Sequence, residues 1–159
     1  MTVFFWDTSA LAKRYKTEPG TAVVERIFND RPIGVVFASC QVLRLEFHSM
    51  AAREARGGRI AKGNAARMLR SFLEDYAGFT VILLSGELAV EAAGQASQYG
   101  LKALDSLHFA ALLRVREAYP GKVAFVTSDR ELLLAGTGAG IPVLDPTAAD
   151  AATVLRRLR

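Results

Sequence analysis

Short apolar runs that alternate with longer helical segments constrain the fold of this chain more than any other feature of its sequence. The runs are Val3 to Trp6, Val35 to Ala38, Phe79 to Leu84, Val123 to Thr127 and Pro142 to Leu144. Polar residues, Gly or Pro bound each run, as is typical of buried parallel strands. The alternation predicts an α/β three-layer sandwich, in which helices flank a mainly parallel sheet of about five strands on both faces.

The segments between these runs have the length and the ends expected of helices. They lie near residues 8 to 16, 20 to 29, 40 to 56, 60 to 77, 86 to 99, 103 to 118, 129 to 135 and 147 to 157. Glycines follow several of them, as helix ends require. A chain of 159 residues without a repeat or a linker is expected to form a single domain over residues 1–159.

The composition excludes several classes of protein. Hydrophobic residues make up 51% of the chain and charged residues 23%, which is typical of an ordinary globular protein. No apolar run approaches the roughly 18 residues that a membrane span needs. Cys40 is a single cysteine and forms no internal disulfide, and the first residues lack the pattern of a secretory signal. These features predict a cytoplasmic protein that does not associate with a membrane.

Acidic residues follow two of the predicted strands directly. Asp7 comes after the first strand and Asp129 after the fourth. In an open parallel sheet ligands bind at the carboxyl ends of the strands, so both acids are candidate site residues. Each acid is equally well explained as the N-cap of the helix that follows it.

Two further acids lie on predicted helices that meet the same edge. Asp105 is near the start of an apolar helix that leads into the fourth strand, so this helix runs antiparallel to the strand and begins at its carboxyl edge. Glu46 lies about two turns into the helix after the second strand, on a stripe with Val42 and Met50. A stabilising interaction with the helix dipole is the structural alternative for Asp105, and a solvated head group is the alternative for Glu46.

Four carboxylates that meet at one edge repel one another strongly. Each pair about 8 Å apart costs on the order of 2 kcal/mol at an effective dielectric near 20. Either some of the acids are protonated or a cation lies among them. Oxygen ligands alone favour a hard ion, so the predicted cofactor is Mg²⁺ or Mn²⁺.

At this point the sequence resembles the PIN-domain ribonucleases, and within them the VapC-type toxins of toxin–antitoxin pairs. The resemblance rests on Asp7-Thr8-Ser9-Ala10-Leu11, on Glu46 in its helix, on Leu104 to Ala111, on Thr127 to Leu132 and on Gly140 to Pro146. The segments occur in the family's order and span nearly the whole chain. The segment from 56 to 78 carries no distinctive motif and lies where the family varies.

The resemblance implies a divalent-metal-dependent endoribonuclease. It implies that Asp7, Glu46, Asp105 and Asp129 are both the metal ligands and the catalytic acids, and that Ser9 and Thr127 support them. The implied partners are an RNA substrate, a cognate antitoxin and a second copy of the chain in a homodimer.

The positive charge of the chain is concentrated in one stretch. Arg44 to Arg70 contains seven basic residues and two acids, a balance of +5 against +4 for the whole chain. Arg53, Arg56, Arg59 and Lys62 are candidate RNA-binding residues, because contacts with the RNA backbone are electrostatic. A solvated pair of helices or a docking surface for the antitoxin explains this stretch equally well. His48 and His108 are isolated in the sequence, and packing explains them better than catalysis.

Two other functions fit parts of the pattern. A nucleophilic aspartate at Asp7 would suit an aspartyl-phosphate phosphatase or a receiver-like domain. The phosphatase pattern needs an acid where this chain has Ser9, however, and the receiver pattern needs a lysine after the last strand, where Gly140 to Pro146 has none. A catalytically silent PIN-like module that binds RNA or protein is the other alternative, and the loss of an acid that is its usual signature is not seen.

Overall fold

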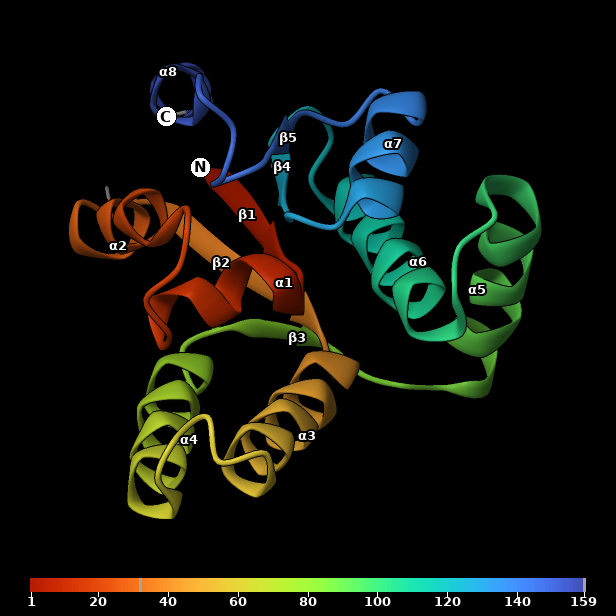
Figure 1. The fold of residues 1–159 in the computed structure, drawn as a ribbon. Coiled ribbons are helices and arrows are strands. Elements are labelled where there is room, and N and C mark those ends of the chain that lie inside the picture. The colour runs from red at the N-terminus through yellow and green to blue at the C-terminus, as the bar shows by residue number, and fades with distance from the viewer. Residues whose placement is uncertain (32, 159) are drawn as a thin grey trace.

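The central sheet of the computed structural model, which describes residues 1–31 and 33–158, consists of five parallel strands (Figure 1). These are β1 (Thr2–Trp6), β2 (Val35–Cys40), β3 (Thr80–Ile82), β4 (Val123–Val126) and β5 (Val143–Leu144), in the spatial order β3-β2-β1-β4-β5. The strand β1 lies at the centre, with Trp6 opposite Ser39 of β2 and Val126 of β4. The residues that follow β1 and β4 therefore leave the sheet at the same level.

Helices cover both faces of the sheet. They are α1 (Thr8–Leu11), the 3-10 helix η1 (Ala12–Arg14), α2 (Thr21–Asn29), α3 (Val42–Arg56), α4 (Lys62–Tyr76), α5 (Gly86–Tyr99), α6 (Ala103–Ala118), α7 (Arg130–Gly138) and α8 (Ala151–Leu158). Alternate side chains of β1 point to opposite faces. Phe4 and Trp6 pack in one core with α1 to α4 and α8, and Val3 and Phe5 pack in the other with α5 to α7. The predicted three-layer α/β sandwich is confirmed.

The element boundaries differ from the prediction by a few residues in several places. The strand β2 extends to Cys40 because Ser39 and Cys40 pair with β3. The helix α7 continues to Gly138, three residues past its predicted end. The last helix begins at Ala151 rather than near 147, because the carboxylate of Asp145 accepts hydrogen bonds from the backbone and hydroxyl of Thr147 and forms a turn there.

Aromatic side chains hold α3, α4 and η1 together. The rings of Phe47 on α3 and Phe72 on α4 are stacked, with centroids 4.0 Å apart and planes 7° from parallel. Tyr15 meets both rings edge-on. Phe47 and Phe72 are fully buried, so this cluster is the centre of the contact between the two helices. Because Glu46 directly precedes Phe47, the cluster also fixes the part of α3 that carries this acid.

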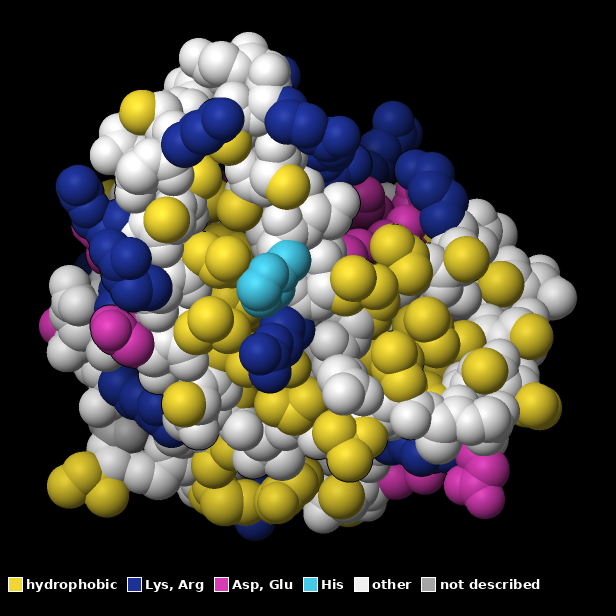
Figure 2. Space-filling view, turned by 90° about the horizontal axis from the view of Figure 1, so that it is seen from below, with side chains coloured by type: hydrophobic (Ala, Val, Ile, Leu, Met, Phe, Trp, Pro, Cys, Tyr) yellow, Lys and Arg dark blue, Asp and Glu magenta, His cyan; other side chains and the backbone are white. Residues whose placement is uncertain are grey.

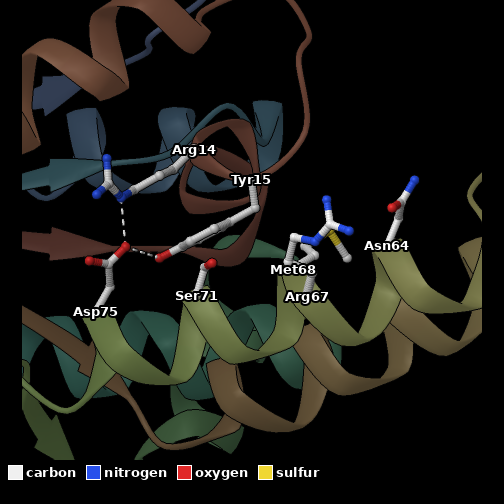
Figure 3. A pocket seen from close by; sticks show the side chains of 7 residues that line it. All are labelled: Arg14, Tyr15, Asn64, Arg67, Met68, Ser71 and Asp75. Atoms are coloured by element: carbon white, nitrogen blue, oxygen red, sulfur yellow. Dashed lines mark hydrogen bonds and ion pairs between the residues drawn. The ribbon is translucent and has the colours of Figure 1, made fainter.

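A cavity of about 470 Å³ lies beside this cluster, between η1 and α4 (Figure 3). The carboxylate of Asp75 accepts hydrogen bonds from the guanidinium of Arg14 and the hydroxyl of Tyr15 at one end of the cavity, both at 2.6 Å. None of the acids predicted to form the site lines the cavity. The two hydrogen bonds to Asp75 connect η1 and the residue after it to α4.

The surface includes a group of large exposed hydrophobic residues. Leu45, Leu83 and Leu84 are each 46–64% exposed. The backbone amide of Leu84 donates to the side chain of Gln41, which places the segment after β3 beside the first turn of α3, where Leu45 lies. Figure 2, which views the molecule from below, shows hydrophobic side chains over a broad area of this face.

In the part of the chain that the structure describes, no helix combines the length and the apolar character needed to span a bilayer.

Candidate active site

Asp7 accepts hydrogen bonds from residues that follow two different strands, β1 and β4. It is the N-cap of α1 and only 4% exposed. Its Oδ2 accepts from the backbone amide and hydroxyl of Ser9 and, at 2.9 Å, from the hydroxyl of Thr127, which follows β4. Its Oδ1 faces Nε2 of His108 at 3.8 Å. The structure thus brings Ser9 and Thr127, predicted as supporting residues, into direct contact with Asp7.

Asp129 occupies the corresponding position after β4. It is the N-cap of α7, and its Oδ1 accepts from the backbone amides of Glu131 at 2.9 Å and Leu132 at 3.0 Å. The backbone amide of Asp129 in turn donates to the hydroxyl of Thr127 at 3.0 Å. The capping role that the sequence suggested for Asp7 and Asp129 is therefore real. It does not exclude a role in the site, because each cap uses a single carboxylate oxygen.

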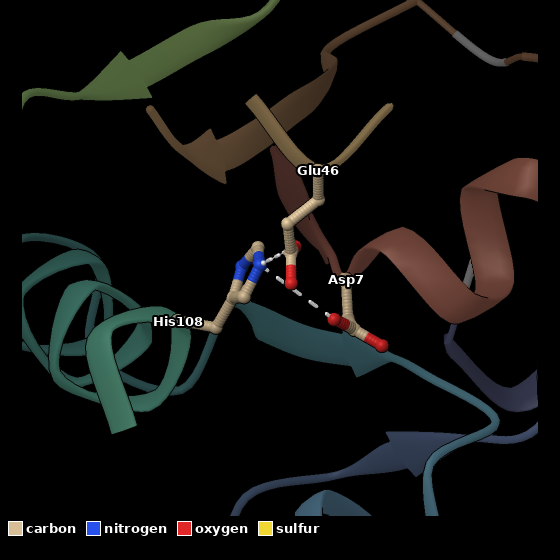
Figure 4. Close-up of side chains that lie close together, drawn as sticks. All are labelled: Asp7, Glu46 and His108. Carbon is tan, nitrogen blue, oxygen red and sulfur yellow. Dashed lines mark hydrogen bonds and ion pairs between the residues drawn. The ribbon is translucent and has the colours of Figure 1, made fainter. Parts of the chain in front are cut away.

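Glu46 reaches the same edge from the second turn of α3. Its Oε2 accepts from the hydroxyl of Thr8 at 2.5 Å and from Nε2 of His108 at 2.7 Å (Figure 4). Burial alone raises the pKa of Glu46, but the hydrogen bonds from His108 and Thr8 and the nearby charge of Arg53 outweigh burial and hold the pKa below its ordinary value. Glu46 is therefore ionised at neutral pH.

The surroundings of Asp105 disfavour its charged form. It lies in the first turn of α6 and is partly buried. Burial, followed by the negative charges of Asp129, Asp7 and Glu46, raises its pKa from 3.8 to about 6. Asp105 thus experiences the negative charge of each of the other three acids. Their ligand atoms form two groups within which every distance is at most 4.8 Å: Asp7, Glu46 and His108 in one, and Asp105, Asp129 and Glu131 in the other.

The arrangement of oxygens fits a hard divalent cation. In the described part of the chain, hydrogen bonds occupy Oδ2 of Asp7, Oε2 of Glu46 and Oδ1 of Asp129, and none falls on the second oxygen of these carboxylates. Each acid is thus fixed by one oxygen and offers the other. Burial, and after it the negative charges of Asp129, Asp7 and Glu46, raise the pKa of Asp105. Oxygen donors with excess negative charge are what Mg²⁺ and Mn²⁺ require.

His108 corrects one interpretation of the sequence. It is fully buried, as packing predicts, but it is not isolated, because its Nε2 contacts Glu46. Burial alone lowers the pKa of His108, and the hydrogen bond to Glu46 and the charges of Asp7 and Glu46 outweigh burial and raise the pKa. The spacing from Asp105 to His108, i to i+3 on one helix, is the sequence signal that places both on the same face.

The structure places two further side chains, those of Thr8 and Glu131, beside the acids. The hydroxyl of Thr8 binds Glu46 and directly follows Asp7 in the chain. Glu131 lies with Asp105 and Asp129 and forms a 3.8 Å ion pair with Lys102. Asp145 contacts none of the four acids, but accepts from the hydroxyl of Ser128 and so holds the loop between β4 and α7.

The predicted RNA-binding residues lie at the far end of α3 and just beyond it. Arg53 and Arg56 are exposed in the last turn of α3, and Lys62 is exposed at the start of α4. Arg53 follows Glu46 by two helical turns, and its charge lowers the pKa of Glu46. Arg59 donates to Glu54 at 2.7 Å, so part of its charge is already compensated. Of the four, Arg53 has the most direct electrostatic link to the acids.

The comparison with known structures identifies the same fold in proteins with little sequence identity. A crystal structure from Pyrobaculum aerophilum is 24% identical with a TM-score of 0.62, and the match covers 99% of this chain and 95% of that one. VapBC from nontypeable Haemophilus influenzae is 13% identical with a TM-score of 0.59, covering 92% and 100%. DNA-bound VapBC from Salmonella typhimurium is 17% identical with a TM-score of 0.60, covering 92% and 99%.

The comparison with sequence families gives a direct assignment. No curated protein sequence matches the chain. The model of the PIN domain family matches residues 4–136, which include all four acids and the strands that position them. The chain therefore belongs to the PIN domain family.

Proposed function

We propose that the protein is a divalent-metal-dependent endoribonuclease whose catalytic and metal-binding acids are Asp7, Glu46, Asp105 and Asp129. The observation that carries this proposal is the convergence of four acids from four different elements, three of them fixed by one oxygen with the other left open. The raised pKa of Asp105, caused by burial and then by the negative charges of the other three acids, supports it.

The residues of the site would have two roles in RNA hydrolysis: some would hold the metal ion, and others position these ligands. Asp7, Glu46, Asp105 and Asp129 would hold Mg²⁺ or Mn²⁺ through their open oxygens. When bound, such an ion activates water and neutralises charge that builds up on the phosphodiester. Ser9 and Thr127 hold Asp7, and Thr127 also fixes the backbone of Asp129, so these residues set the spacing between the two acids. Pre-organisation of this kind means that no side chain has to reorient during the reaction.

Binding of Mn²⁺ is expected to stabilise the folded protein. An ion that binds the native state alone raises the melting temperature, and at 100 times its Kd it adds about 2.7 kcal/mol. For a chain of this size that corresponds to a rise of roughly 5–11 °C. Thermal melting with EDTA and with millimolar Mn²⁺ measures the effect. Cleavage of single-stranded RNA in the same two buffers tests the activity, and the absence of both a shift and cleavage would contradict the proposal.

Arg53 is expected to guide the RNA backbone toward the acids. Replacing Arg53 by Ala should weaken RNA binding uniformly across sequences and reduce the slope of log affinity against log salt by about 1, since one phosphate contact is lost. Fluorescence anisotropy of a labelled RNA in EDTA at several salt concentrations measures this. Arg157→Ala is the matched control, because Arg157 is exposed on α8, away from the carboxyl ends of the strands (Figure 1). Equal salt slopes for wild type and Arg53→Ala would exclude the contact.

We further propose that the chain is the toxin of a toxin–antitoxin pair and that it forms a homodimer. Support for the antitoxin comes from the structural neighbours, several of which are described as toxin–antitoxin or VapBC complexes. Support for a protein interface comes from the exposed Leu45, Leu83 and Leu84, since contiguous apolar residues on a surface mark protein contacts.

The homodimer has a simple test. Light scattering after size exclusion should give a mass of about twice 17.2 kDa for the wild type. Replacing both Leu83 and Leu84 by Asp should give the monomer mass, because two charges would be buried against the partner. Val90→Asp is the control, because Val90 is an even more exposed apolar residue on α5 outside this group. A wild type that is monomeric at high concentration would contradict the proposal.

A further inference from the structure

His108 is a buried polar side chain placed among the acids. It lies on α6, is 0% exposed, and points between Glu46 and Asp7 (Figure 4). Its Nε2 is 2.7 Å from Oε2 of Glu46 and 3.8 Å from Oδ1 of Asp7. Its Nδ1 is buried and has no hydrogen-bond partner among the described residues. The ring therefore makes its polar contacts through Nε2 alone.

The contact with Glu46 determines where the ring carries a proton. An ionised carboxylate only accepts hydrogen bonds, so the bond to Glu46 requires hydrogen on Nε2. This holds for the neutral ring and for the charged ring alike. A nitrogen that bears hydrogen has no lone pair for a metal ion. While this bond is present, His108 is a hydrogen-bond donor to Glu46 and not a ligand.

The two hydrogen bonds to Glu46 fall on the same oxygen. Thr8, on α1, and His108, on α6, both donate to Oε2, which restrains the orientation of the carboxylate. Oε1 receives no hydrogen bond from the residues that the structure describes, so it is the oxygen that Glu46 offers. Replacing a residue that hydrogen-bonds to a metal ligand typically lowers the metal affinity 10–100-fold.

We propose that His108 is a positioning residue of the metal site, which holds Glu46 through Nε2–H and stays outside the coordination sphere. This inference rests on the proposed metal-dependent function and deepens it. It predicts that all protein ligands of the metal are oxygen atoms, although a nitrogen of His108 lies close to the carboxylates of Asp7 and Glu46. The alternative is that Nε2 loses its proton and binds the metal directly, together with Asp7 and Glu46.

A set of amide substitutions tests the proposal through Mn²⁺ affinity, measured by titration calorimetry. In His108→Gln the side-chain amide reaches the position of Nε2 and can still donate to Glu46, whereas in His108→Asn it reaches the position of Nδ1. His108→Leu fills a similar volume without a donor. We expect the Kd for Mn²⁺ to rise about 10–100-fold in the Leu and Asn variants and to stay within about threefold of wild type in the Gln variant.

Electron spin-echo spectroscopy of bound Mn²⁺ distinguishes positioning from coordination directly. Wild type is expected to show no nitrogen bound to the metal. Coupling to a coordinated imidazole nitrogen would overturn the proposal, as would a Gln variant that is as impaired as the Leu variant. His48→Gln is the control for the loss of a histidine, because His48 is exposed on α3, and its affinity should match wild type.

The outcomes separate this inference from the function on which it rests. A wild-type protein that binds no Mn²⁺ would contradict the metal-dependent function and, with it, this role of His108. A wild-type protein that binds Mn²⁺ while His108→Leu binds it equally well would overturn the role of His108 alone. Thermal melting of each variant in EDTA shows whether it is folded before its affinity is compared.

Discussion

Asp105→Asn is expected to abolish metal-dependent cleavage of RNA and, at the same time, to raise the melting temperature of the metal-free protein. The loss of activity follows from the loss of a proposed ligand, since a bound metal contributes several kcal/mol to catalysis. A loss of that size corresponds to a decrease of roughly 10²–10³-fold in kcat. The opposite change in stability follows from the burial of the Asp105 carboxylate and from the repulsion that it experiences from Asp129, Asp7 and Glu46.

The expected gain in stability is modest. A rise in pKa from 3.8 to about 6 corresponds to at most about 3 kcal/mol. Asp105 is partly exposed to solvent, which screens these charges, so about 1 kcal/mol is a more realistic gain. For a chain of this size that amounts to a rise of about 2–4 °C in melting temperature at pH 7.

The sign of the pH dependence gives this prediction a second check. The carboxyl of Asp105 has a higher pKa in the folded protein than in the unfolded chain, so the folded protein binds the proton more tightly. Its charge therefore destabilises the fold fully above pH 6, and this penalty disappears as the pH falls through about 6 toward 4. In EDTA the melting temperatures of wild type and Asp105→Asn should differ at pH 7 and converge near pH 4.

Glu117→Gln is the matched control for Asp105→Asn. Glu117 is an exposed acid near the other end of the same helix, and its replacement should change neither activity nor the melting difference between pH 7 and pH 4. A lower melting temperature for metal-free Asp105→Asn would contradict the prediction.

Asp7→Asn is a less clear test of the same idea. Asp7 caps α1 and accepts three hydrogen bonds, and the side-chain amide of Asn cannot accept all three equally well.

Phe72→Ala is expected to have the largest effect on stability. Phe72 is fully buried and stacked on Phe47, and removing such a ring from a core typically costs 3–5 kcal/mol. Urea unfolding monitored by circular dichroism measures the change in the free energy of unfolding. Ser71→Ala is the control at the neighbouring exposed position on α4 and should have little effect.

The same substitution should also weaken metal binding. Phe47 is adjacent to Glu46, so the loss of its stacking partner loosens the turn of α3 that carries this acid. In Phe72→Ala protein that is still folded, we expect a higher Kd for Mn²⁺ than in Ser71→Ala. A variant with full stability would show that α4 contributes little to the fold. A destabilised variant with unchanged metal affinity would show that α3 is fixed by the sheet and α6 instead.

The pattern of short apolar runs was sufficient to predict the sheet and its helices. A buried parallel strand must be apolar on both faces, and Val3 to Trp6 and Val123 to Val126 have this property without reference to the rest of the chain. The positions of Asp7 and Asp129 follow from this pattern, because a residue directly after a parallel strand lies at its carboxyl edge. Local sequence therefore determined the fold class and the edge at which to look for a site.

What only the tertiary structure decided is which atoms meet at that edge. The sequence gives no sign that Oε2 of Glu46 accepts from both Thr8 and His108, because these residues come from three elements whose contact depends on how α3 and α6 pack against the sheet. It also places Asp105 near the other acids without showing that its surroundings disfavour its charged form. Periodicity specifies the face of an element on which a side chain lies. Hydrogen bonds and pKa values depend on distances of a few ångströms between elements, and packing alone sets those distances.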